Sequence, residues 1–183
     1  MAQGFTVFAT PIGACGIAWS EHGVIGVQLP EGGEEQSRVR LARRFPNARP
    51  GPPPASVGEA IARIIALLGG EPDDLAGVPL DFGAASALHR RVWELARAIP
   101  PGKTRAYGEI AADLGDPALA REVGQALGRN PFPIIVPCHR VLAAGGGIGG
   151  FSAHGGIDTK RRLLAIESDF ADGEPDLFRP ARG

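Results

Sequence analysis

The chain lacks the signatures of membrane and secreted proteins. None of its 183 residues belongs to an unbroken apolar run of the roughly 18 residues that a membrane helix needs. A basic flank followed by a long apolar run is also missing at the N-terminus, so we expect no signal peptide. Only two cysteines are present, and one of them is a candidate reactive thiol, which suits a reducing compartment. We therefore expect a cytoplasmic protein that does not engage a membrane and is associated with the nucleoid if bacterial.

Signatures of metal and cofactor binding are also missing. No CxxC or HxxxH pair supports a zinc site that would use Cys15, His22 and His89, so we predict no bound metal. Cys15 is instead predicted to be a packed strand residue. The glycine run Gly145–Gly150 must be a loop, but it lacks the Walker lysine and the Rossmann spacing. We expect no organic cofactor either.

Charge is nearly balanced over the whole chain but is unevenly distributed. The net charge is −1, which by itself argues weakly against nucleic acid. Residues 1–83 carry a net −3, residues 84–162 a net +5, and residues 163–183 a net −3. A basic middle segment is typical of a surface that meets an anionic partner. The alternative is uneven charge on a solvated surface.

The first half of the chain has the pattern of a small α/β unit. The predicted elements are a hairpin of residues 16–20 and 24–29, a helix over 34–45, a proline-rich loop or connector over 47–54, and a helix over 56–68 that Ser56 caps and Gly69-Gly70 ends. The last helix is predicted to bury Ile61, Ile64, Ile65 and Leu68. We place a domain boundary near Gly83.

The second half has the pattern of several short helices. The predicted elements are a helix opened by Ser86, a helix from Tyr107 to Leu114 with Thr104 as its cap, a helix from Pro117 to about Gly128 capped by Asp116, and a last helix from about residue 158. Gly115 suits the turn between the second and third of these. These two helices and their turn predict a helix-turn-helix motif.

One face of the helix over 117–128 is made of small and polar residues. They are Ala118, Arg121, Gly124, Gln125 and Gly128. A glycine costs a helix about 1 kcal/mol, so its presence needs a reason. A helix that must enter a narrow groove, such as the minor groove of DNA, is one reason. Close packing against another helix is the alternative.

The stretch over residues 134–141 combines an apolar run with reactive side chains. Residues 134–136 look like a buried strand that Pro137 ends, and Cys138, His139 and Arg140 follow at once. A thiol beside a base and a permanent cation can be held as a reactive thiolate. Neighbouring side chains on an extended chain point to opposite faces, so Cys138 and His139 cooperate only if the backbone turns or a water bridges them. The plain alternative is a packed free cysteine.

These residues, with their flanks, resemble the O6-alkylguanine-DNA alkyltransferases, also called methylated-DNA–protein-cysteine methyltransferases. The motifs are Asn130-Pro131, Pro137-Cys138-His139-Arg140-Val141, Gly150-Phe151-Ser152 and Lys160…Leu163-Leu164…Glu167. The resemblance is close over residues 80–168 and loose before them. It implies an α/β protein with a small ribonuclease-H-like N-terminal domain (1–83). A mostly helical, winged-helix-like domain with the helix-turn-helix (84–168) would follow. Independently of the resemblance, the acidic composition of residues 169–183, rich in Gly and Pro, predicts a mobile tail.

The resemblance also implies a reaction and a role for each residue. Cys138 would irreversibly accept an alkyl group from O6 of guanine, or O4 of thymine, in double-stranded DNA that a monomer binds through the minor groove. The implied roles are deprotonation of Cys138 through a water by His139, orientation of His139 by Glu167, proton donation by Tyr107, bracing of the active-site turn by Asn130, replacement of the rotated-out base by Arg121, and lining of the pocket by Val141, Phe151 and Ser152. Phe151 stands where the family usually has tyrosine, and Ala153-His154 looks inserted.

Two other functions remain open from the residues. A Cys-His hydrolase or acyl transferase would use the same pair of side chains with an orienting carboxylate. It would leave the basic helix-turn-helix unexplained. A non-enzymatic module that flags alkyl lesions is the other, and the presence of Cys138 counts against it.

Overall fold

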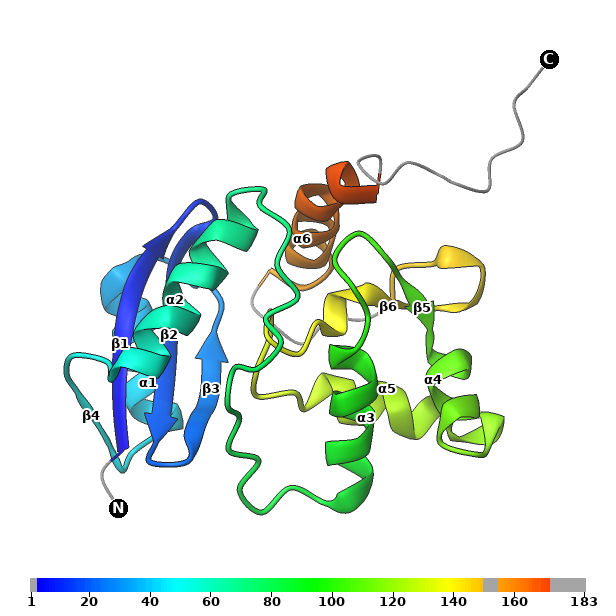
Figure 1. Ribbon diagram of the computed structural model, residues 1–183, viewed down its shortest axis with the longest axis horizontal. Coiled ribbons are helices and arrows are strands. Elements are labelled where there is room, and N and C mark those ends of the chain that lie inside the picture. The colour runs from blue at the N-terminus through cyan, green and yellow to red at the C-terminus, as the bar shows by residue number, and fades with distance from the viewer. Residues whose placement is uncertain (1–2, 150–154, 172–183) are drawn as a thin grey trace.

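A computed structural model describes residues 3–149 and 155–171. Its architecture is mixed α/β, as predicted. Figure 1 shows a β-sheet with its helices on one side of the molecule and a group of short helices on the other. None of the helices in the described ranges is long and apolar enough to cross a membrane.

The sheet has four strands in the order β3-β2-β1-β4. Strands β1 (Gln3–Thr10), β2 (Gly13–Ser20) and β3 (Gly23–Gln28) form an antiparallel meander, which confirms the predicted hairpin. The proline-rich stretch was predicted to be a loop or connector, and this is wrong for the short edge strand β4 (Ala48–Pro50), which pairs parallel with β1. Proline is tolerated there because β4 lies at the edge of the sheet.

A helix covers each face of this sheet (Figure 1). Helix α1 (Glu34–Arg44) places Leu41 against Phe5 and Ala18 on one face. Helix α2 (Ala55–Leu68) packs on the other face, where Cys15 is fully buried, as predicted for a packed strand residue.

The predicted cap of α2 is wrong. Its predicted apolar stripe is confirmed at Ile64 and Leu68, which are buried, and Ile61 packs against the core, but Ile65 is wrong. Pro54 is the N-cap of α2, so Ser56 lies inside its first turn. The buried residues are Val57, Ala60, Ile64, Leu67 and Leu68. Ile65 is exposed, because an apolar run of neighbouring residues fits more than one helical stripe and only the packing partner selects one.

The second half begins with helix α3 (Ala87–Arg97), whose predicted cap is confirmed: Ser86 Oγ accepts a hydrogen bond from the His89 amide at 3.2 Å. Helix α4 (Tyr107–Asp113) is not capped by Thr104, and this prediction is wrong. The carboxylate of Glu109 instead accepts from the Ala106 amide at 2.6 Å.

A tight turn joins α4 to the next helix. Gly115 has φ +98°, the left-handed conformation expected of it. Asp116 then accepts from the Ala118 amide at 2.9 Å, opening a 3₁₀ turn (Pro117–Leu119) that continues as α5 (Ala120–Gly128). This helix pair has the predicted start, turn and end.

One apolar core extends through both halves of the molecule. It joins buried residues of β2, β3 and α2 to those of α3 and α5, and reaches Cys138 and Leu163. The last helix, α6 (Gly156–Ala171), starts near the predicted place and extends beyond residue 168 into the segment predicted to be a mobile tail. The division at Gly83 stays a prediction.

Candidate active site

The apolar run before Cys138 is not a strand, which corrects the interpretation of residues 134–136. These residues form a buried irregular turn in which Ile134 has φ +76°. Prolines at 131, 133 and 137 remove amide donors that a strand would need. The Val136 amide instead bonds back to the Phe132 carbonyl at 2.8 Å.

The backbone reverses again at Pro137 and presents the reactive residues from a 3₁₀ turn. Pro137 has φ −79° and ψ 68°, and the Cys138 amide bonds to the Val136 carbonyl at 2.8 Å across it, an inverse γ-turn. The 3₁₀ turn Cys138–Arg140 follows. The backbone therefore turns at the Cys-His pair, one of the two conditions for their cooperation.

The side chain of Asn130 lies across this double turn. Its Nδ2 donates to the Val136 carbonyl at 2.8 Å, and its Oδ1 accepts from the Phe132 amide at 2.9 Å. Asn130 thus bridges both ends of the segment that leads into Cys138.

Cys138 is a buried thiol among groups that favour a negative charge. It is 8% exposed, and burial raises the pKa of the thiol. A hydrogen bond from Asn130, the charge of Lys160 and two backbone amides oppose this shift in pKa. The resting group is therefore a protonated thiol that has anion-stabilising donors already in place.

Behind Cys138 lies a buried trio of charged and titratable side chains. His139 Nε2 is 2.9 Å from Glu167 Oε1. Arg140 donates to both carboxylate oxygens of Glu167, Nε to Oε2 at 2.8 Å and Nη2 to Oε1 at 2.7 Å. Burial alone would raise the pKa of Glu167, but the hydrogen bonds from His139 and Arg140 lower it to about 2. Glu167 is therefore ionised at neutral pH.

The ionised carboxylate determines the tautomer of His139. A carboxylate only accepts hydrogen bonds, so Nε2 must carry the hydrogen. Burial, more than the opposing effect of Glu167, lowers the pKa of His139, so the ring is neutral and its Nδ1 has a free lone pair. Within the described residues Nδ1 is buried and has no hydrogen-bond partner. It is a base placed next to the thiol-bearing residue.

Two buried cations at the site were not among the predicted site residues. Arg140 also donates to the Ile99 carbonyl at 2.6 Å, which ties the end of α3 to Glu167. Lys160 is fully buried and donates to the Val141 carbonyl at 2.7 Å. Burial lowers the pKa of Lys160, and the Cys138 charge opposes this. The sequence feature that pointed to Lys160 was its position on the same helix face as Leu163.

Tyr107 approaches this cluster from the start of α4. Burial, and then the charge of Cys138, raise the pKa of its phenol, so it stays protonated and can donate. Lys160 Nζ lies 5.8 Å from the centre of the Tyr107 ring. The parallel pairing of β5 (Arg105–Ala106) with β6 (Val141–Leu142) connects the start of α4 to the end of the Cys138 turn.

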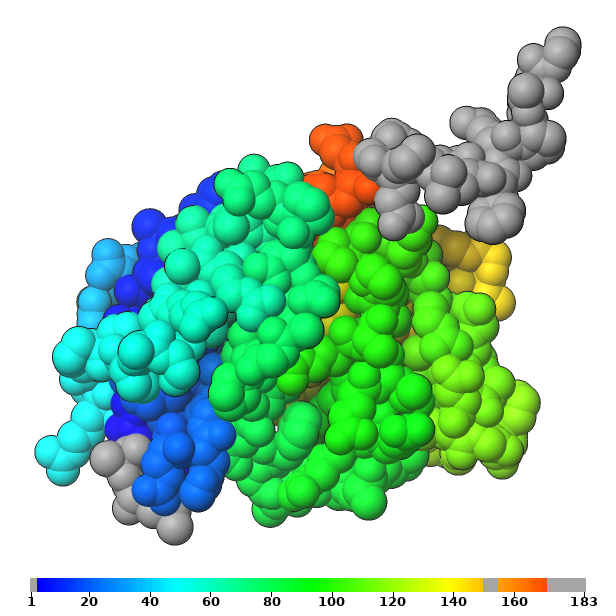
Figure 2. All heavy atoms as spheres, in the orientation of Figure 1, coloured from blue at the N-terminus to red at the C-terminus, as the bar shows by residue number. Residues whose placement is uncertain are grey.

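The structure thus gathers Cys138, His139, Glu167, Asn130, Val141 and Tyr107, six of the predicted site residues. The predicted DNA-facing residues form a separate surface on α5 and the turn before it. Ala118, Arg121, Gln125 and Gly128 are exposed, and Gly124 is half-buried beside Tyr107. In Figure 1, α5 lies in the half of the molecule opposite to α1, and Figure 2 shows the same orientation with all heavy atoms as spheres. Phe151 and Ser152, with the Ala153-His154 insertion, lie outside the described residues.

Stability should depend on pH through Glu167. The pKa of its carboxyl falls from 4.5 to about 2 on folding, so ionisation contributes about 3 kcal/mol to the free energy of unfolding. A depressed folded pKa means that this contribution is present above about pH 4.5 and is lost as the pH falls toward 2. Urea unfolding at several pH values would measure it. Glu167→Gln should lack this part of the acid sensitivity, and equal acid losses in both proteins would contradict the assignment.

Within the described ranges, no group of three or more His, Cys, Asp or Glu residues could hold a metal ion. The groups gathered around Cys138 are its thiol, an imidazole, a carboxylate, a phenol and two buried cations. Such a set can deprotonate a sulfur nucleophile and donate a proton to a leaving group.

Comparisons with known proteins show which family the chain is similar to. The family model described as "6-O-methylguanine DNA methyltransferase, DNA binding domain" matches residues 87–169. The methylated-DNA–protein-cysteine methyltransferase of Mycolicibacterium paratuberculosis is 42% identical over 125 residues, covering 68% of this chain and 73% of that protein.

Solved structures extend the likeness over nine tenths or more of the chain. The crystal structure of the Mycobacterium tuberculosis O6-methylguanine methyltransferase is 35% identical, has a TM-score of 0.74, and covers 97% of this chain and 99% of its own. A second structure from that organism, in complex with DNA, is 34% identical, has a TM-score of 0.72, and covers 91% and 94%. This chain therefore belongs to the family of methylated-DNA–protein-cysteine methyltransferases.

Proposed function

We propose that this protein repairs alkylated DNA directly, by moving an alkyl group from O6 of guanine to the sulfur of Cys138. The observation that carries the proposal is the buried Cys138 thiol next in the chain to a neutral imidazole whose Nδ1 has no hydrogen-bond partner among the residues that the structure describes. The S–C bond forms as the C–O6 bond breaks, and the electron pair leaves with the purine. A thioether has no ready leaving group, so each molecule acts once.

Protons move through the two titratable neighbours of the sulfur. The thiol proton passes to His139 Nδ1 through one bridging water, since Nε2 is committed to Glu167. The imidazolium that results is stabilised by the Glu167 carboxylate. Lys160 and Asn130 stabilise the thiolate while it exists.

The departing guanine needs a proton, because it leaves poorly as an anion. Tyr107 remains protonated through the neutral range and lies close enough to Cys138 for their charges to interact. It would donate toward the purine as the C–O6 bond breaks. The base must rotate out of the duplex to reach a buried sulfur, which costs roughly a few kcal/mol and less for a weakly paired lesion.

The glycines of α5 support docking of this helix in the minor groove of DNA. A Cβ at Gly124 would meet only the Tyr107 ring at 3.9 Å, and a Cβ at Gly128 would meet nothing within 4 Å. Packing against the side chains in the described part of the chain therefore does not require glycine at either position. A narrow groove outside it does explain them. The related M. tuberculosis protein crystallises with DNA, which fits this use of the helix.

We propose the finer fold and assembly on the same resemblance. The N-terminal sheet would be ribonuclease-H-like, the α4–α5 region winged-helix-like, and the protein a monomer on double-stranded DNA. A monomer is sufficient because the six gathered site residues come from one chain.

Arg121, exposed in the first turn of α5, should fill the place of the rotated-out base. Arg121→Ala is expected to slow repair of a duplex about 10- to 100-fold, because the vacated stack is no longer filled. Repair of the same lesion in a single strand should change little, since no stack needs filling there. Single-turnover rates on both substrates measure this, with Arg43→Ala on α1 as the control. Equal losses on both substrates would contradict the role.

Intact mass spectrometry tests the proposed function. After incubation with a duplex that holds O6-methylguanine, the protein should gain the mass of one CH₂ unit, because a methyl group replaces the thiol hydrogen. Peptide mapping should place the gain on Cys138, and a second portion of DNA should produce no further reaction. Turnover of an acyl-thioester probe at Cys138, without methyl transfer, would instead indicate a Cys-His hydrolase. Binding to the lesion without any mass gain would indicate a non-enzymatic module.

A further inference from the structure

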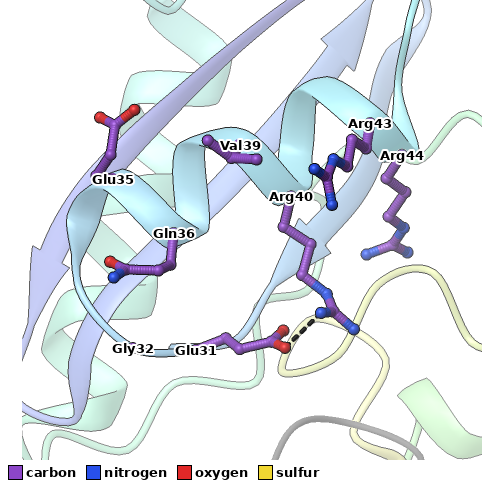
Figure 3. Close-up of a pocket in the computed structure, with 8 residues that line it drawn as sticks. All are labelled: Glu31, Gly32, Glu35, Gln36, Val39, Arg40, Arg43 and Arg44. Carbon is purple, nitrogen blue, oxygen red and sulfur yellow. Dashed lines mark hydrogen bonds and ion pairs between the residues drawn. The ribbon is translucent and has the colours of Figure 1, made fainter.

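Arg44 connects the N-terminal half of the molecule to the turn that carries the active site. It is the last residue of α1, and its guanidinium donates to two backbone carbonyls. One belongs to Val27 on β3, at 2.9 Å, and the other belongs to Pro131, at 3.0 Å. Figure 3 shows Arg40 turned toward Glu31, whereas Arg44 extends from the end of the helix.

The Pro131 carbonyl is held from two directions. β3 is an edge strand of the sheet, and the Val27 amide on this strand donates to the Pro131 carbonyl at 2.8 Å. Arg44 supplies the second donor to the same oxygen. The carbonyl is therefore fixed to the sheet by Val27 and to the end of α1 by Arg44.

Pro131 directly follows Asn130, whose side chain braces the Cys138 turn. A displacement of the Pro131 backbone would also move the neighbouring Asn130, whose side-chain amide donates to the Val136 carbonyl. The Val136 carbonyl also accepts from the Cys138 amide. A short series of hydrogen bonds thus leads from the α1 end to the reactive sulfur.

Among the described residues, Arg44 and Val27 supply the hydrogen bonds to the Pro131 carbonyl. A cleft of about 330 Å³ borders Arg44, Phe45, Pro131 and Phe132, so among the described residues this side of the turn is open. The guanidinium of Arg44 donates to both of its carbonyl acceptors. Burial is the larger cause that lowers its pKa, and the charge of Arg40 is the smaller one. Two donors in a fixed planar fork suit two separate carbonyls better than a lysine would.

From this geometry we infer that Arg44 is a positioning residue, which sets the rate of alkyl transfer by holding the Asn130–Cys138 turn and makes no contact with DNA. The inference rests on the proposed function. It gives the N-terminal half a defined task, because both donors to Pro131 come from that half.

The rate and the amplitude of a single-turnover reaction separate positioning from simple destabilisation. The amplitude counts the molecules that are folded and competent, whereas the rate constant at saturating DNA reports the geometry of the site. Arg44→Ala should keep the full amplitude and lower the rate constant roughly tenfold, since small misplacements of reacting groups slow a reaction strongly. Arg44→Lys, which keeps the charge and part of the hydrogen bonding, should recover part of the rate. DNA affinity, measured in the Cys138→Ala background, should not change.

Arg43 provides the matched control, because it is the preceding arginine on α1 and is exposed like Arg44, whereas the hydrogen bonds to the Val27 and Pro131 carbonyls come from Arg44. Arg43→Ala should leave the rate, the amplitude and the affinity as in the wild type. An unchanged rate constant in Arg44→Ala overturns the inference, whatever happens to the amplitude. Weaker DNA binding with an unchanged saturated rate also overturns it, because Arg44 would then act as a DNA contact.

Hydrogen exchange tests the same link without DNA. The amides of Val136 and Cys138 are hydrogen-bonded within the turn and should exchange faster in Arg44→Ala but not in Arg43→Ala. If the wild type transfers no alkyl group, the proposed function fails. The exchange data alone then test whether Arg44 holds the Asn130–Cys138 turn. Unchanged exchange would then overturn the inference as well.

Discussion

Cys138→Ala should abolish methyl transfer completely and leave DNA binding intact. The sulfur is the acceptor atom, and alanine keeps the backbone turn while it removes that atom. The contacts that would hold DNA lie on α5 and the turn before it, outside the Cys138 turn. A gel shift with a lesion-bearing duplex, run beside the intact-mass assay, separates binding from chemistry.

The second cysteine cannot take over this role. Cys15 lies in β2, is fully buried in the core, and burial raises the pKa of its thiol to about 11 although Thr10 opposes the shift. Cys15→Ala is therefore the matched control and should transfer the methyl group as the wild type does. Methyl gain in Cys138→Ala would show that the acceptor is another residue.

Glu167→Gln should lower the rate of transfer by about 10²- to 10⁴-fold, as loss of the orienting carboxylate does in a catalytic triad. The amide can neither hold His139 in one tautomer nor stabilise the imidazolium. It also leaves the guanidinium of Arg140 buried without its counter-charge, which costs about 3–5 kcal/mol of unfolding free energy. Single-turnover kinetics and urea unfolding on the same variant measure both effects.

Glu94→Gln is the control for this change, because Glu94 is an exposed residue of α3 whose nearest ion-pair partner is 3.8 Å away. It should alter neither the rate nor the stability. If Glu167→Gln kept the wild-type rate in its folded fraction, proton transfer through His139 would be wrong. The thiol would then need another base.

Helix and turn positions that depend on local chemistry were predictable. Ser86, Gly115 and Asp116 act through hydrogen bonds or backbone angles within two or three residues of themselves. The β2–β3 hairpin is similar, because its alternation and turn are local. Thr104 and Ser56 failed as caps, since Glu109 and Pro54 took these roles in competition with them.

The geometry of the active site was much less predictable. An apolar run gives the same sequence pattern in a strand and in a buried turn, so the strand predicted for residues 134–136 was wrong. Arg140 could be named as a cation near the thiol, but its partner Glu167 lies 27 residues away. The role of Arg44 had no local sign at all, because its acceptor is 87 residues further along the chain.

The sequence by itself determined the reactive groups, the short helices and the family, because a rare motif and local capping rules need no knowledge of distant partners. Only the tertiary structure decided that Glu167 is ionised, that His139 Nδ1 is free, and that Arg44 reaches the active-site turn. Those properties depend on burial and on contacts between residues far apart in the chain, and neither is encoded in local spacing.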